Sequence, residues 1–132
     1  MQLGTANEPS ADTGQFIAAL DALVATMHET AENAAWAAGR AEGIRDRLRC
    51  GMSARDIIEN EDGPLLPELV TSMLRGLLEA GSRLRRHEAH ALHAEGLSMD
   101  AIGQLFGVTR QRVSALLRSS IDEPATWWGD QT

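Results

Sequence analysis

The sequence predicts an all-α protein, a helical bundle with a long N-terminal helix and two short helices at its C-terminal end. Residues that favour helices, such as Ala, Leu, Glu and Arg, are abundant, whereas Val, Thr and aromatic residues are sparse. Apolar residues recur with heptad spacing over residues 14–49, and a glycine-centred turn separates two short amphipathic segments near residue 107. The 132 residues suffice for one domain or two very small ones.

Residues 14–49 are predicted to form one long helix, straight or with a bend. Its apolar residues follow alternating steps of three and four, which is a heptad a/d stripe. The middle of the stripe is all alanine, so a partner helix can approach closely there. Apolar neighbours widen the stripe, which fits a helical bundle better than an isolated two-stranded coiled coil. We expect the stripe to pair two protomers of a homodimer through Ile17, Leu20, Val24, Met27, Ala31, Ala34 and Ala38.

The chain after residue 49 predicts two further helices separated by a loop. Ser53, with Asp56 three positions later, is typical of a helix N-terminus, and this helix ends near Asn60. The Asp-Gly-Pro of "EDGPLLP" indicates a loop, and a leucine-rich helix follows from about Pro67 to Glu95. The expected organisation is a disordered arm over 1–13, a helical dimerisation module over 14–95, a helix-turn-helix over 96–120 and a flexible tail over 121–132.

The segment "EGLSMDAIGQLFGVTRQRVSALLR", residues 95–118, predicts two helices joined by a tight turn. Gly96 ends the preceding helix, and Ser98 caps the next one. Gly107 permits the sharp turn because glycine adopts a positive φ without penalty, and Thr109 caps the last helix. The positions expected to face inward are Ile102, Leu105 or Phe106, Val113, Leu116 and Leu117.

This segment resembles the DNA-binding helix-turn-helix of bacterial transcription factors. It is most similar to region 4 of sigma-70-type factors and to the C-terminal domains of the Hin-like invertases. The resemblance covers 24 of the 132 residues, with Gly103 where alanine is commoner. It implies that the second helix reads the major groove of DNA, through Thr109, Arg110, Gln111, Ser114, Ala115 and Arg118.

The chemistry of these side chains suits contact with DNA. Arginine pairs bidentately with guanine, and glutamine pairs with adenine. Arg112 is expected to contact a phosphate, and the backbone amide of Ser98, at a helix N-terminus, can hold another. A helical hairpin that only folds, or that contacts a protein, is the alternative for the same pattern.

The preceding helix carries further basic side chains in "RLRRHEAHALH". Arg83, Arg85 and Arg86 are predicted to hold phosphates beside the reading helix, although a solvated helix face explains them equally well. His87 and His93 diverge by about 120° on a helix of 3.6 residues per turn. No cysteine or acidic set lies near enough in the sequence to complete a metal shell, so no metal site and no cofactor are expected.

Charge is unevenly distributed along a chain whose formal net charge is -7. Residues 1–80 hold six arginines and thirteen acidic residues, whereas residues 81–119 hold six arginines and three acidic residues. Because binding to nucleic acid depends on the local patch, the overall acidity does not exclude it. One cysteine, Cys50, excludes an internal disulfide framework and fits a reducing cytosol.

These observations together predict a sequence-specific DNA-binding transcriptional regulator that acts as a homodimer on an inverted-repeat site. The alternative is a protein-interaction adaptor whose acidic N-terminal helices bind a partner such as RNA polymerase or a sigma factor. No nucleophile–base pair, phosphate loop or paired carboxylates are evident, so an enzyme is not expected. No apolar run is long enough for a membrane span. The expected location is therefore the bacterial cytoplasm, in association with the nucleoid.

Overall fold

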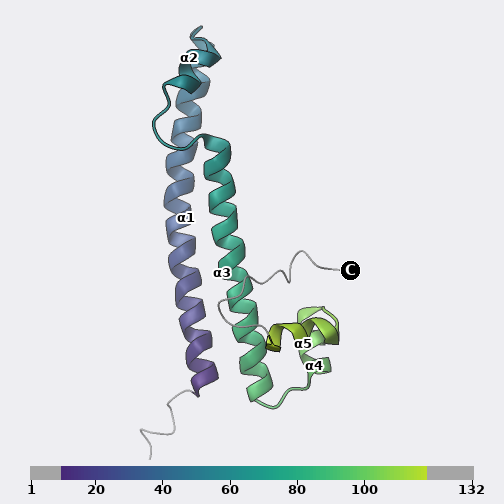
Figure 1. The fold of residues 1–132 in the computed structure, drawn as a ribbon. Helices are drawn as coiled ribbons and strands as arrows, with labels where there is room; N and C mark the ends of the chain where they lie inside the picture. The colour runs from purple at the N-terminus through teal and green to yellow at the C-terminus, as the bar shows by residue number, and fades with distance from the viewer. Residues whose placement is uncertain (1–9, 119–132) are drawn as a thin grey trace, which may run out of the picture. The chain divides into compact units, whose positions relative to one another are not determined.

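The computed structural model describes residues 10–118, and this part of the chain is entirely helical (Figure 1). The predicted all-α class and long N-terminal helix are confirmed. None of the described helices is long and apolar enough to cross a membrane. The helices, in chain order, are α1 (Ala11–Arg49), α2 (Ala54–Glu59), α3 (Leu66–Ala94), α4 (Met99–Phe106) and α5 (Arg110–Arg118).

Helix α1 begins three residues before the predicted start, so the prediction that residues 11–13 belong to a disordered arm is wrong. The Ser10 hydroxyl accepts a hydrogen bond from the backbone N–H of Thr13 at 3.2 Å. Asp12, in the first turn, lies at the positive end of the helix dipole. These two local features favour a helix that starts at Ala11. Residues 1–9 and the predicted tail over 121–132 lie outside the described residues.

The described residues divide into two compact units, and α1 and α3 each contribute to both. The first unit, which we call the reader unit, contains residues 10–24 and 79–118. The second, which we call the loop unit, contains residues 25–78 with α2 and the loop after it.

In the loop unit, Arg40 connects α1 to the loop after α2. Its Nε donates to Glu61 at 2.7 Å, and its Nη1 donates to the carbonyl of Pro64 at 2.7 Å. These interactions, joined by Arg47 at 3.6 Å, hold the pKa of the Glu61 carboxyl below its usual range, with the Arg40 hydrogen bond as the main cause. The Arg40 guanidinium also lies over Trp36, which remains exposed rather than packed in the chain's own core as a tryptophan usually is.

In the reader unit, the core is built mainly from α3, α4 and α5. Ile102 and Val113 are fully buried and Leu116 nearly so, as predicted. Of the two alternatives for the next inward position, Phe106 is the one partly buried, whereas Leu105 is 66% exposed. The Arg85 guanidinium lies 3.9 Å from the centre of the Phe106 ring, so α3 and α4 are in direct contact.

Helix α1 presents two adjacent apolar faces. The face that turns inward carries Ala19 and Ala37, which are buried, with Phe16 and Leu23 partly buried. The predicted heptad stripe lies beside it and stays exposed. Its larger residues, Ile17, Leu20, Val24 and Met27, are between 39% and 55% exposed, and its three alanines are exposed as well.

Candidate nucleic-acid interface

A side-chain cap begins each of the helices α4 and α5, and a glycine forms the turn between them. The Ser98 hydroxyl accepts from the backbone N–H of Ala101 at 3.1 Å. The Thr109 hydroxyl accepts from the backbone N–H of Arg112 at 3.1 Å. Between the helices, Gly107 has a φ of 71°, a left-handed conformation that side chains other than glycine disfavour. The connection from Phe106 to Arg110 is therefore only three residues long.

A close approach between α4 and this connection requires a residue without a side chain. A Cβ added at Gly103 would lie 2.8 Å from the carbonyl oxygen of Val108, closer than real Cβ atoms come to any backbone atom. Gly103 itself is buried. The backbone of the turn and the Val113 side chain of α5, whose Cγ2 is 3.6 Å from the added Cβ, both lie close to this position.

The outer face of α5 carries the polar residues that the resemblance assigns to DNA. Thr109, Arg110, Gln111 and Arg118 are exposed, and Ser114 and Ala115 are partly exposed. Opposite them, Val113 and Leu116 anchor the helix in the core. The side chains able to donate to base edges are therefore exposed on the face of α5 opposite its buried residues.

One neighbour of this face was not anticipated. Asp100, in the first turn of α4, lies 3.8 Å from the Arg110 guanidinium, and both side chains are exposed. Its first-turn position was evident from the sequence, but the pairing across the turn depends on the angle between the two helices. Exposed pairs of this kind contribute little, about 0–1 kcal/mol, so Arg110 can exchange this partner for another acceptor.

The three arginines of α3 that were predicted to hold phosphates occupy different environments. Arg83 is exposed, and a phosphate contact from it stays a prediction. Arg86 is only 3% exposed, so the prediction of a phosphate contact there is wrong. Arg85 is partly buried, stacks on Phe106 and pairs with Glu88 at 3.0 Å. Its charge already serves the contact between α3 and α4, so a phosphate contact from Arg85 stays a prediction that would compete with this contact.

Arg112 lies between these extremes. Its residue is partly exposed, whereas its Nε is buried. Ser98 is exposed at the N-terminus of α4, where its backbone amide can face an anion. The candidate cationic contacts are therefore the exposed Arg83, Arg110 and Arg118 and the partly exposed Arg112.

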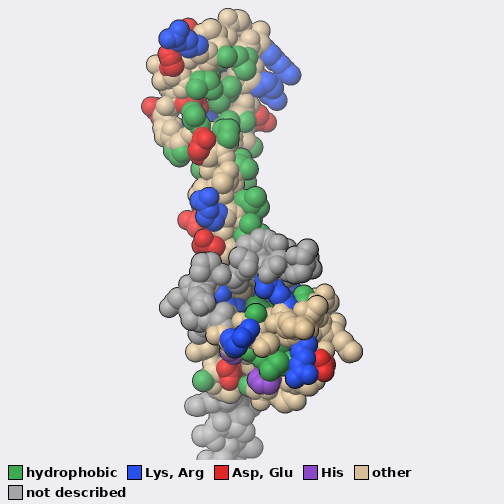
Figure 2. Space-filling model, turned by 45° about the vertical axis from the view of Figure 1, so that its right-hand side comes forward, with side chains coloured by type: hydrophobic (Ala, Val, Ile, Leu, Met, Phe, Trp, Pro, Cys, Tyr) green, Lys and Arg blue, Asp and Glu red, His purple; other side chains and the backbone are tan. Residues whose placement is uncertain are grey.

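Figure 2 shows basic side chains exposed around α4 and α5. Comparison of the chain with protein-family models, with curated proteins and with solved structures found no match.

Proposed function

We propose that α4 and α5 form a helix-turn-helix that binds double-stranded DNA sequence-specifically, and that the protein regulates transcription. The observation that carries this proposal is the outer face of α5. Arg110 and Gln111 are exposed on its first turn, directly after the three-residue connection from α4. Arginine and glutamine are the side chains that pair bidentately with guanine and adenine.

The test is duplex binding by the purified protein after its preferred site has been selected from a random DNA pool. Arg110→Ala and Gln111→Ala should each weaken binding to that site by about 1–3 kcal/mol and relax the base preference. Arg55→Ala is the matched control, because Arg55 is an exposed arginine on α2, in the other unit. If both α5 variants bound the selected site like the parent, the groove assignment would be wrong.

Salt dependence gives an independent measurement. Because Arg86 is buried and Arg85 is stacked on Phe106, we count two or three phosphate contacts in each protomer, from Arg83, Arg118 and Arg112. Each neutralised phosphate contributes about 0.9 to the slope of log K against log salt. A dimer should therefore give a slope of about -3.5 to -5.5 by the same relation. A slope near zero would contradict DNA binding through this surface.

We also propose that the protein acts as a homodimer. The heptad stripe of α1 supports this, because large apolar residues there remain exposed next to a line of alanines. A single helix-turn-helix rarely binds DNA tightly, so pairing would supply the second half of the contact.

A protein-interaction adaptor is the second candidate, favoured by the surface of the loop unit. Apolar side chains are exposed there, as Figure 2 shows for the end that holds α2. Residues 25–78 also carry nine acidic residues against six arginines. This candidate gains if the protein binds purified RNA polymerase or a sigma factor but shows no salt-dependent duplex binding. The exposed apolar residues are Trp36, Leu48, Met52, Ile58, Leu65, Val70 and Leu74.

A further inference from the structure

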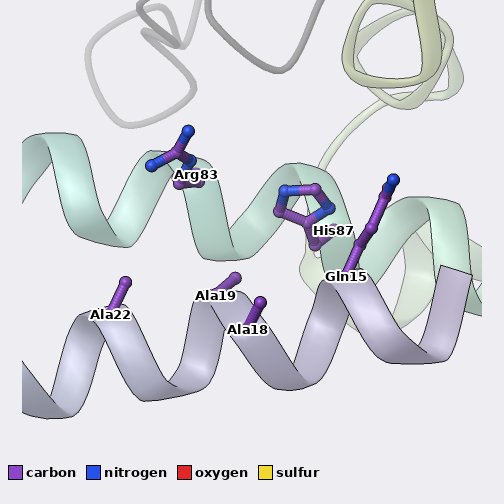
Figure 3. A pocket seen from close by; sticks show the side chains of 6 residues that line it. All are labelled: Gln15, Ala18, Ala19, Ala22, Arg83 and His87. Atoms are coloured by element: carbon purple, nitrogen blue, oxygen red, sulfur yellow. The ribbon is translucent and has the colours of Figure 1, made fainter.

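A pocket of about 270 Å³ lies between α1 and α3 within the reader unit. Figure 3 shows the His87 ring between the side chains of Arg83 and Gln15, above a row of small residues on α1. The pocket is not fully enclosed, and its lining residues Gln15, Ala18 and Ala22 are exposed. The lining residues are Gln15, Ala18, Ala19, Ala22, Arg83 and His87.

His87 is the residue that distinguishes this pocket from an ordinary groove between helices. It is only 5% exposed, yet its Nδ1 has no hydrogen-bond partner within the described residues. Buried polar atoms in folded proteins almost always have a partner. A ligand atom that accepted a hydrogen bond from this nitrogen would therefore satisfy a group that the protein itself leaves unsatisfied.

The charges around His87 favour a negatively charged ligand. Burial is the main cause that lowers the pKa of His87, and Arg83, His90 and Arg86 on the same helix lower it further. From α1, Asp12 is the group that acts in the opposite direction, and the pocket residues of that helix are uncharged. Positive charge therefore outweighs negative charge around His87, and an anion in the pocket would reduce this excess of positive charge.

We propose that this pocket binds a small oxyanion, a carboxylate or a phosphate group carried by a small molecule with a short apolar part. Arg83 and the Gln15 amide would donate to its oxygens from the two sides, and protonated His87 would donate through Nδ1. The methyl groups of Ala18 and Ala22 would contact the apolar part.

The site is compatible with pairing through the α1 stripe. On a helix of 3.6 residues per turn, Ala18 and Leu20 point in directions about 160° apart. Ala19 lies between them and faces inward. The pocket and the stripe therefore flank opposite sides of the contact between α1 and α3, and occupation of one leaves the other accessible.

The experiment is a titration of the full isotope-labelled chain, without DNA, followed by NMR of the His87 ring and the alanine methyl groups. The probes are inorganic phosphate, acetate and butyrate, with sodium chloride holding ionic strength constant. Measurements at about pH 6 and about pH 7.5 lie on either side of the ordinary histidine pKa. We expect saturable shifts, tighter binding at the lower pH and a higher His87 pKa in the bound state. Butyrate should bind more tightly than acetate, because it adds an apolar part.

Two variants and one control complete the test. Arg83→Gln should weaken binding about tenfold or more, as expected when a charged hydrogen-bond donor is removed. Ala18→Glu, at an exposed position, should abolish saturation by placing a carboxylate in the pocket. Arg75→Gln, an exposed position on the same helix, should bind like the parent. Shifts that fail to saturate, or equal affinity of the parent and Arg83→Gln, would overturn the proposal and leave DNA binding untouched.

Discussion

At the scale of single residues, geometry and family resemblance make opposite predictions about how an alanine at Gly103 would affect stability. Alanine is commoner there in the resembling families, and it favours helix by about 1 kcal/mol over glycine. In this chain the added Cβ would meet the backbone carbonyl of Val108, which cannot rotate away. We expect Gly103→Ala to lower the free energy of unfolding by about 1–3 kcal/mol in urea titrations. Gly39→Ala, where an added Cβ meets nothing, should raise it by up to about 1 kcal/mol.

A Gly103→Ala variant as stable as its parent would show that the turn relaxes to accept a side chain.

The environments of single residues were predictable from the sequence where they depend on nearby residues, and not where they depend on distant ones. The caps at Ser53, Ser98 and Thr109 were predicted correctly, because each depends on atoms three residues away. The different environments of Arg83 and Arg86 could not be predicted, because they depend on which face of α3 another helix covers.

At the scale of elements, the contact between α3 and α4 depends on the stack of Arg85 on Phe106. The short distance, 3.9 Å, and the partly buried environment make this pair stronger than a surface contact. Arg85→Ala should lower the free energy of unfolding by about 0.5–2 kcal/mol and speed amide exchange in α4. Glu88→Gln removes the ion pair but keeps the stack, so its effect should stay within about 1 kcal/mol. Equal losses in the two variants would mean that the stack contributes nothing.

The helices were largely predictable from the sequence, but the faces that they bury against other helices were not. Glycine and proline in the loop before α3, and the spacing of apolar residues in α1, are local signals, so the helices appear close to their predicted bounds. Helix α1, however, has two neighbouring apolar faces. The heptad pattern alone did not show that Ala19 and Ala37 turn inward while the main stripe remains exposed. That choice depends on contacts with residues distant in the sequence.

At the scale of the whole molecule, the uneven charge agrees with the proposal that one surface binds DNA and another pairs two protomers. Residues 81–119 carry six arginines against three acidic residues, within a chain of formal net charge -7. Arginines that are buried or stacked reduce the usable positive surface further, so non-specific affinity for DNA should be modest. Under this proposal, useful affinity requires two copies of the reading helix on one duplex, and the exposed stripe of α1 supplies the means of pairing.

The last prediction concerns that pairing. Val24→Asp with Met27→Asp would place two unpaired charges in the proposed interface, at a cost of about 3–5 kcal/mol. Sedimentation velocity should then show a dimer for the parent and a monomer for the double variant. Ala25→Asp, an exposed position about 100° around the helix from Val24, should remain dimeric.

Because a two-fold protein imposes its symmetry on DNA, the parent's footprint should be an inverted repeat with half-sites about 34–36 Å apart, or a multiple of that. A parent that stays monomeric at high micromolar concentration, or protects one asymmetric half-site, would contradict the homodimer and leave α5 to act singly.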